Sequence, residues 1–422
     1  MTATKKPESP AVAPEPWQAQ NLGGIWRSYV AKVRGGDVGA LPAVLGLLVL
    51  VIVFSILRPD TFTSELNFAN LINQSAAVTV IAMGLVFVLL LGEIDLSAGF
   101  TGGTAAAVMG VVMTNHDQGW FISVLACIAT GVVIGTCIGL LVARLGIPSF
   151  VVTLAAYLGL QGVMLEIIGE GGTIPFENES IRAITDKNLP VWLGWTLAAA
   201  LVLGYAAVTY LRNARRRRAG LQHEPTLLWA IKTGSLAVIA VLFVGYLSRE
   251  RSLNPAFKSL KGVPNSMVVI LGLLLVLSFL LGRSAWGRHV YAVGGNAEAA
   301  RRAGINVMWV KLSCFILCSS VAAIGGLLLA ARNHSVSPQT GGNETLLYAV
   351  GAAVIGGTSL FGGKGRVVDA VIGGTVVAVI ANGMGLLNQE PGVVYIVTGL
   401  VLLVAASVDA ISRRRAAASG RA

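Results

Sequence analysis

Charged residues are scarce in this chain of 422 residues. Asp, Glu, Lys and Arg make up 12% of the sequence, whereas hydrophobic residues make up 55%, and the mean hydropathy is +0.75. A soluble domain of this length carries far more charge on its surface, so the composition excludes an ordinary water-soluble protein. The sequence instead predicts an all-α, polytopic membrane helix bundle, because helices satisfy their own backbone hydrogen bonds within a bilayer.

Cysteine and histidine are also scarce, with four residues of each. Cys127, Cys137, Cys314 and Cys318 all lie inside predicted spans, where a thiol behaves as a small apolar group. The four histidines lie in separate loops or at span edges, so they form no ligand set of the kind that holds a metal. We therefore expect no disulfide, no metal site, no catalytic residue and no bound cofactor.

The glycine-rich stretch GGTSLFGGKGRV at residues 356–367 resembles a phosphate-binding loop but lacks its defining pattern. Such a loop requires a glycine five residues before the glycine that precedes its lysine, and then Ser or Thr. Thr358 and Gly365 occupy those two positions here. The stretch is better interpreted as a turn between membrane helices, with Lys364 and Arg366 holding it on the cytoplasmic side, and the chain is expected to have no ATPase site of its own.

Long apolar runs fill most of the chain from residue 41 onward. A helix needs about 20 apolar residues to cross the hydrocarbon core, and the hydropathy pattern gives twelve such spans. An even number places both termini on one side, and a cytoplasmic N-terminus puts most of the 31 Lys and Arg on the cytoplasmic side. The predicted spans are 41–57, 72–91, 97–114, 119–142, 148–168, 190–211, 227–247, 264–282, 307–330, 345–360, 367–387 and 392–411.

Basic runs follow two of the spans, RNARRRR at 212–218 and SRRR at 412–415. A run of this kind can indicate nucleic-acid binding, but directly after an apolar span it is typical of a topological anchor near anionic lipid. Residues 412–422 are therefore predicted to be a basic cytoplasmic tail. Residues 1–40 are predicted to be a cytoplasmic tail that ends in a short interfacial helix, because Trp26, Tyr29, Val30 and Val33 fall at helical spacing.

Small residues predict where the helices pack most closely. Gly131, Gly135 and Gly139 recur every fourth residue and therefore share one helix face. Close backbone approach supplies much of the attraction between helices in lipid, so this face is expected to contact a neighbouring helix.

Two loops carry the same weak pattern, G-x-x-x-L-x-x-G. They are GEIDLSAG at 92–99 and GGTSLFGG at 356–363, each at the cytoplasmic end of a span. The similarity suggests weak internal repeats. Candidate functional positions in the two loops are Gly92, Glu93, Asp95, Gly99, Gly356, Gly357, Gly362, Gly363 and Lys364.

Glu93 and Asp95 are the most informative charges, because carboxylates at the edge of the membrane are costly and commonly functional. Coupling to protons or cations is one interpretation. Structural capping is the other, and Asp95 is well placed to accept a hydrogen bond as the N-cap of the helix that follows.

The segment 283–306 is too polar to enter lipid and too short to form a domain. Within it, NAEAARRAG predicts a short helix that Asn296 caps, with Glu298 in its first turn and Arg301 and Arg302 in its last. Gly304 can close the helix. A rigid helix between flexible glycines is suited to docking into a groove on a partner.

These motifs carry a resemblance to a known family. EAARRAG matches the E-A-A-x-x-x-G coupling motif of importer permeases driven by ATP-binding-cassette subunits. Together with GEIDLSAG and GGTSLFGGKGR, it makes the chain resemble the ribose/xylose-type monosaccharide permeases. The resemblance covers residues 40–411 except for about 185–262, which adds a two-span insertion to the ten-span core. The insertion and the GEIDLS form resemble the xylose-type branch.

The resemblance implies a permease subunit in a bacterial cytoplasmic (inner) membrane, present as a homodimer. A cassette ATPase subunit would bind ATP on the cytoplasmic side, and an extracytoplasmic sugar-binding protein would deliver cargo, xylose being the first expectation. Membrane lipid is an implied partner and nucleic acid is not. The implied ATPase-coupling residues are Gly294, Gly295, Asn296, Glu298, Ala299, Ala300 and Gly304.

The substrate path is less clearly marked in the sequence. A neutral polyol needs a few hydrogen-bonding groups in an apolar wall. Alternatives remain open: another sugar, a nucleoside or an amino acid as cargo, a non-transporting scaffold, or an ion-coupled secondary transporter that uses Glu93, Asp95 or Glu166. The polar candidates inside spans are Thr153, Tyr157, Gln161, Glu166, Thr375 and Asn382.

Overall fold

The computed structural model describes residues 23–24, 39–169, 171–221, 223–252, 255 and 259–418. The predicted interfacial helix before residue 39 lies outside these residues. The elements in chain order are α2 (Leu41–Leu57), α3 (Pro59–Phe62), α4 (Glu65–Leu90), α5 (Ala98–Gly110), the π-helix η1 (Val111–Asn115), α6 (Trp120–Ala143), α7 (Ser149–Ile168), β1 (Ile174–Pro175), α8 (Glu179–Asp186), α9 (Val191–Arg218), α10 (Thr226–Leu247), α11 (Asn265–Arg283), α12 (Ala285–Gly295), α13 (Ala297–Arg302), α14 (Val307–Asn333), β2 (Ser335–Val336), α15 (Asn343–Ile355), α16 (Val367–Leu386) and α17 (Pro391–Ala418).

The predicted helical membrane bundle is confirmed. In the part of the chain that the structure describes, nine helices are long and apolar enough to cross a membrane. The other three predicted spans correspond to the shorter helices α2, α5 with η1, and α15. Strand structure in the described chain is limited to β1 and β2, which pair antiparallel with Ile174 opposite Val336.

Four span boundaries were predicted wrongly, and one of them is the end of α17, which continues past the predicted residue 411 to Ala418. The helix α4 begins at Glu65, seven residues before the predicted start, because Glu65, Asn67 and Asn70 lower the local hydropathy without interrupting the helix. The helix α9 continues through the basic run to Arg218, since arginine is a good helix former. The helix α15 ends at Ile355 instead of residue 360, at a pair of glycines.

The described chain divides into two compact units, and α9 and α10 supply the residues Trp195–Val244 of the smaller one. These two helices are held together by Trp229, whose Nε1 donates to Thr209 Oγ1 at 2.9 Å and whose ring lies 5.7 Å from that of Tyr210. The residues Trp195–Val244 fall within the predicted insertion at 185–262, and their description as an insertion stays a prediction.

The larger unit is built around α14. This helix packs against α4, α5 and α6, while α16 packs against α4 and α15. The predicted contact face of α6 is confirmed: a side chain added at Gly135 would lie 2.7 Å from the backbone oxygen of Phe315, and Gly131 and Gly139 are equally close to α14. Glycine at these positions lets the α6 and α14 backbones approach directly.

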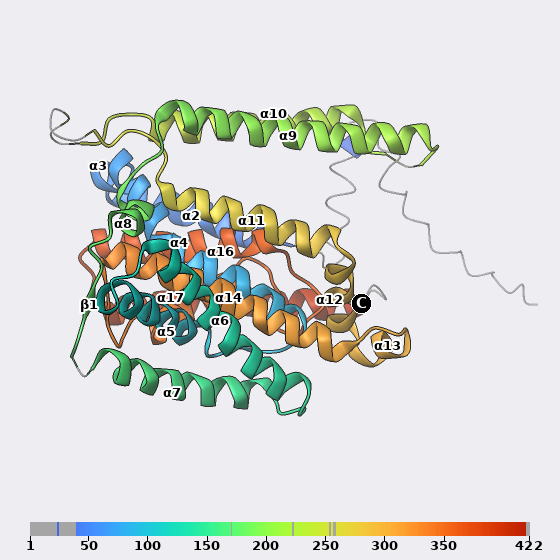
Figure 1. Ribbon diagram of the computed structural model, residues 1–422. Coiled ribbons are helices and arrows are strands. Elements are labelled where there is room, and N and C mark those ends of the chain that lie inside the picture. The colour runs from blue at the N-terminus through green and yellow to red at the C-terminus, as the bar shows by residue number, and fades with distance from the viewer. Residues whose placement is uncertain are drawn as a thin grey trace, which may run out of the picture. The chain divides into compact units, whose positions relative to one another are not determined.

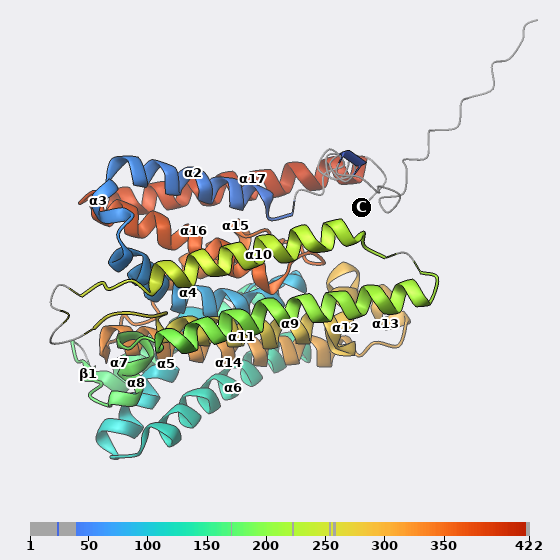
Figure 2. The ribbon, with the colours of Figure 1, turned by 90° about the horizontal axis from the view of Figure 1, so that it is seen from above.

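The larger unit has two distinct ends (Figures 1 and 2). The short helices α12 and α13 lie at one end, and α3, α8 and β1 lie at the opposite end. The central helix α4 runs the full length between them, from Glu65 beside α3 to Leu90, where its last carbonyl meets the backbone of Gly363.

Candidate functional site

Three segments that are far apart in the sequence meet at the α12–α13 end. We call this region the loop junction and define it as residues 91–97, 284–306 and 356–366. Gly363 N donates to Leu90 O at 2.8 Å, which joins the third segment to the end of α4. A side chain at Gly362 would lie 2.9 Å from both Gly294 O and Gly92 N, so all three backbones are in contact there.

The helix α12 fixes the junction to the bundle. Tyr291 Oη donates to Gly365 O at 2.7 Å, and burial, with the nearby carboxylate of Asp369, raises the pKa of Tyr291. The Trp286 ring stacks on Phe87 of α4 with centroids 5.7 Å apart, and its Nε1 donates to Ser313 of α14 at 2.8 Å. A displacement of α12 is therefore transmitted to α4 and α14 together.

The segment 91–97 connects the junction to two more helices. Glu93 forms an ion pair with Lys311 of α14. Ile94 N donates to Ser149 Oγ at 3.1 Å, and Thr153 Oγ1 donates to Ile94 O at 3.2 Å, both from α7. The predicted path candidate Thr153 is therefore hydrogen-bonded to the segment 91–97.

Asp95 is fully buried, but it does not cap α5 as we expected. Its Oδ1 accepts from Ser97 N at 2.9 Å and from Ser97 Oγ at 2.6 Å, and Ser97 itself is the N-cap residue. The carboxylate closes a local turn two residues before the helix, because short polar side chains readily bond the backbone two positions ahead. Its Oδ2 lies 3.7 Å from Cys318 Sγ of α14.

The predicted short helix is confirmed as α13. Asn296 Oδ1 accepts from Ala299 N at 2.9 Å, and Glu298 forms ion pairs with Arg301 at 3.1 Å and Arg302 at 3.2 Å. Ala300 is buried. The helix is therefore anchored on one side and exposes three charged side chains on the other.

A cavity of about 500 Å³ adjoins α13. It lies between the end of α6 and the start of α14. Its lining residues are Val142, Ala143, Gly146, Arg301, Gly304, Ile305, Asn306, Val307, Met308 and Lys311.

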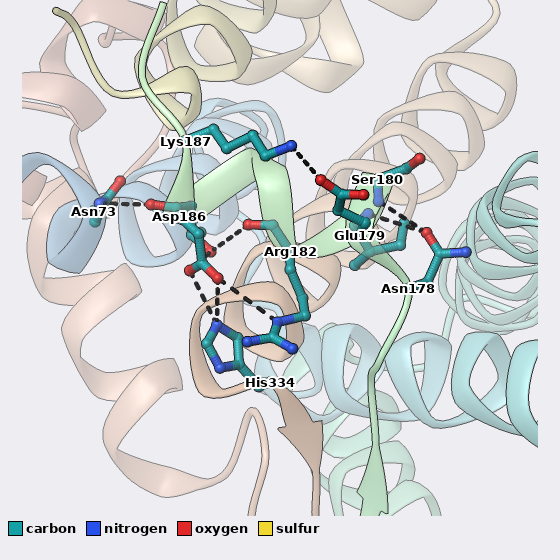
Figure 3. A network of polar contacts seen from close by, with 10 residues as sticks. Asn73, Asn178, Glu179, Ser180, Arg182, Asp186, Lys187 and His334 are labelled. Atoms are coloured by element: carbon teal, nitrogen blue, oxygen red, sulfur yellow. Dashed lines mark hydrogen bonds and ion pairs between the residues drawn. The ribbon is translucent and has the colours of Figure 1, made fainter. Parts of the chain in front are cut away.

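At the opposite end of the bundle, polar contacts hold α8 in place (Figure 3). Asp186 lies between His334, whose Nε2 is 2.9 Å from Oδ2, and Arg182, whose Nε is 3.6 Å from the same oxygen. Asn73 Nδ2 of α4 donates to Thr185 O at 3.0 Å. The network ties α8 to α4 and to the residue that follows α14, so α8 forms a fixed feature of this end.

A second cavity, of about 460 Å³, opens near this end between α4, α14, α15 and α16. Among the predicted path candidates, Asn382 lines it. Its polar lining also includes residues that the sequence analysis did not select. Asn67 and Asn70 precede the predicted span 72–91, and Arg332 and Glu344 lie just outside the predicted spans 307–330 and 345–360. The full set is Asn67, Asn70, Gln74, Ser75, Arg332, Glu344, Thr345 and Tyr348.

The other path candidates lie elsewhere. Thr375 donates to Val371 O within its own helix, and Tyr157 packs edge-on against Phe100 with centroids 4.8 Å apart. Gln161 lines an adjoining cavity of about 410 Å³, which shares Glu344 and Thr345 with the cavity at Asn382. Glu166 is exposed on α7. The structure therefore does not bring the six candidates together.

Comparisons of the sequence with known proteins show the family to which the chain belongs. The sequence model of a family described as "Branched-chain amino acid transport system / permease component" matches residues 67–406, most of the chain. The chain belongs to this family. The matched region includes the loop junction and the cavity between α4, α14, α15 and α16, which we call the amide-rich cavity after Asn67, Asn70, Gln74 and Asn382.

Individual relatives confirm the resemblance to ribose/xylose-type permeases. The chain is 33% identical over 374 residues to the xylose transport system permease protein XylH of Escherichia coli, covering 88% of this chain and 92% of the relative. It is 33% identical over 390 residues to XylH of Haemophilus influenzae, covering 91% and 99%. It is 30% identical over 371 residues to the ribose import permease protein RbsC of Escherichia coli, covering 87% and 92%. No solved structure matches the chain.

Proposed function

We propose that this chain is the membrane-spanning subunit of an ATP-driven importer. It would translocate a monosaccharide, with xylose as the first candidate, from an extracytoplasmic binding protein into the cytoplasm. The observation that carries the proposal is the convergence of the three motif segments beside α13. The xylose assignment is supported by the two xylose permeases among the relatives, each covering most of both chains.

The loop junction is the surface that we assign to the cassette ATPase subunit. The helix α13 exposes Glu298, Arg301 and Arg302 beside an open cavity of about 500 Å³. Charged groups with a neighbouring recess suit a protein partner, because complementary charges orient docking and a recess admits a side chain. In this assignment ATP is bound by the partner and the permease carries out no covalent chemistry.

Orientation and assembly follow from the same assignment. The junction lies in the cytoplasm of a bacterial cell, both termini are on that side, and α8 faces the binding protein. Two copies of the permease would form the translocating pair, and lipid would surround the remaining apolar faces, as the resemblance implies. The basic run at 215–218, which forms the last turn of α9, supports this orientation by the positive-inside rule.

The mechanism transmits a movement along packed helices. When ATP binding closes the motor, α13 moves with it and shifts α12, which is bonded to the turn at Gly365 and stacked on α4. The helix α4 passes from the junction to the amide-rich cavity, so movement at one end changes the other. ATP binding thereby shifts the population between two arrangements of the bundle.

Reconstitution tests the proposal. Purified permease is placed in proteoliposomes with or without its ATPase subunit, and uptake of labelled xylose is measured with the loaded binding protein outside and ATP inside. We expect uptake only in the complete system. Uptake by the chain alone on a proton gradient would instead support an ion-coupled transporter.

A variant at α13 tests the coupling role separately. Replacing Glu298 by Ala removes both of its ion pairs from an exposed helix, so little stability is lost. We expect hydrolysis to become uncoupled from uptake, while the binding protein captures sugar as before. Unchanged uptake for each ATP hydrolysed would contradict the assignment of α13.

A further inference from the structure

The cavity between α4, α14, α15 and α16 has an unusual concentration of carboxamide side chains. Asn67, Asn70 and Gln74 lie on α4 at spacings of three and four residues, so all three share one helix face. Asn382 of α16 lines the same cavity and contacts this face of α4. A carboxamide both donates and accepts hydrogen bonds, and these are the functions that a neutral, hydroxyl-rich ligand requires.

Two of these amides are paired with each other. Asn67 Nδ2 donates to Asn382 Oδ1 at 3.0 Å, and Asn382 Nδ2 donates back to Asn67 Oδ1 at 2.9 Å. Asn382 Nδ2 also lies 3.3 Å from Gln74 Oε1. Asn67 and Asn382 are buried, so each needs a partner when the cavity holds no ligand. A sugar hydroxyl can replace the partner of either side chain, because it carries one donor and two acceptor positions.

The size and charge of the cavity agree with a small neutral ligand. Its volume of about 460 Å³ falls within the range of about 300–1,000 Å³ that is usual for small-molecule sites. Its lining contains one cation, Arg332, and one carboxylate, Glu344, whose Oε1 accepts from the Tyr395 hydroxyl. The two opposite charges balance, and the remaining polar lining is neutral.

The cavity is closed toward the loop junction. A side chain at Gly374 would lie 2.2 Å from Thr79 Oγ1, so α16 and α4 are in direct contact at that level. Beyond Thr79, every residue of α4 to Leu90 is buried. A ligand in the cavity can therefore pass between α4 and α16 toward the junction only if these two helices separate.

We propose that this amide-lined cavity is the sugar site of the permease, and that the Asn67–Asn382 pair is the contact that a bound sugar replaces. The proposal rests on the proposed function. It adds the place where the neutral sugar binds and the residues that recognise it. Movement of α4 and α16, driven from the junction, would release the sugar past Thr79.

The test uses the complete importer in proteoliposomes, with permease, ATPase subunit and binding protein. Asn70→Leu removes a cavity amide and leaves the Asn67–Asn382 pair in place, and Asn382→Leu breaks the pair. Thr398→Val is the matched control, because its hydroxyl donates only to Val394 O of its own helix in the described contacts and it lies outside the cavity lining. Xylose uptake, stimulated ATP hydrolysis and the unfolding midpoint are measured for each.

We expect Asn70→Leu and Asn382→Leu to slow xylose uptake by about tenfold, the effect of one lost hydrogen bond of favourable geometry. Stimulated hydrolysis should stay within about twofold of wild type, since the junction is unaltered. Asn382→Leu should also reduce the preference for xylose over a deoxypentose that lacks one hydroxyl, because leucine cannot form a hydrogen bond with that hydroxyl. Thr398→Val should match wild type in every measurement.

Three results separate the possible failures. If the wild-type importer takes up no pentose, the xylose assignment in the proposed function is wrong. If the wild type transports but both Leu variants equal Thr398→Val, the cavity is not the sugar site. If uptake falls only in proportion to the unfolding midpoint, and the xylose-to-deoxypentose ratio is unchanged, the amide pair has a structural role and the proposal is overturned. The Asn67→Leu/Asn382→Leu double variant supports the proposal if it regains stability but not uptake.

Discussion

The closest backbone contact at the loop junction offers a sharp test of its packing. Gly294 is the second-last residue of α12, and a Cβ added there would lie 1.8 Å from Leu90 O and 3.1 Å from Gly363 N. Both neighbours are backbone atoms, so no side-chain rotation can relieve the clash. In Gly294→Ala, α12 and the end of α4 must separate by more than an ångström, and the 2.8 Å bond between Gly363 N and Leu90 O is strained or lost.

The expected magnitude follows from these two effects. Overpacking of a close contact costs about 1–3 kcal/mol, and loss of the backbone hydrogen bond adds about 1 kcal/mol. We therefore expect Gly294→Ala to lower the free energy of unfolding by about 2–4 kcal/mol. Unfolding of the purified permease by SDS in mixed micelles measures this directly, and xylose uptake for each ATP hydrolysed measures coupling.

The adjacent glycine supplies the control. Gly295 has no neighbouring atom within 4 Å of an added Cβ, and it lies in the same helix. Gly295→Ala should keep the stability of wild type or raise it by up to about 1 kcal/mol, because alanine loses less backbone entropy than glycine in a helix. Equal stability of the two variants would refute the packing that we describe at the junction.

Three further predictions concern other parts of the chain. Gly135→Ala places a methyl group 2.7 Å from Phe315 O and should lower the unfolding free energy by about 1–3 kcal/mol in the same SDS titration. Gly159→Ala, with open space around it, should keep the stability of wild type or raise it by up to about 1 kcal/mol. Lys311→Met leaves the half-buried Glu93 carboxylate without its ion-pair partner and should cost about 1–3 kcal/mol, most of which Glu93→Gln in the same chain should restore; no recovery would contradict the pairing. Hydrogen bonds from Leu260 N, Ser259 Oγ and Ser252 N lower the pKa of Glu250 from 4.5 to about 2. The stability that these bonds contribute is therefore present above pH 4.5 and is lost as the pH falls through about 2. Hydrogen-exchange protection of the Leu260 amide should show the same pH dependence, and protection that disappears near pH 4.5 would contradict it.

Local features of this chain could be predicted from the sequence because short-range physics determines them. The α13 helix has the predicted cap at Asn296 and the predicted charges in its first and last turns. The Gly131 and Gly135 face contacts α14, since four-residue spacing fixes a face irrespective of the partner. The apolar runs also predicted where the helices lie, because the length and hydropathy of a run are local properties of the sequence.

Long-range features could not be predicted in this way. Nothing in the sequence places Gly362 against Gly92 and Gly294, because their contact depends on how three separate helix ends meet. Thr375 and Asn382 are seven residues apart and lie on nearly the same face of α16, and yet Asn382 lines the cavity and Thr375 does not. The position of the cavity along the helix decides this, and a pattern of spans does not contain that position.

Cross-linking between α13 and the ATPase subunit tests the central claim most directly. A photoreactive amino acid at position 301 on α13 is compared with one at position 179 on α8, both exposed and at opposite ends of the bundle. The account predicts that the ATPase subunit is captured from position 301 in the assembled importer and not from position 179. Capture from position 179 alone, or from neither position in an importer that transports, would contradict it.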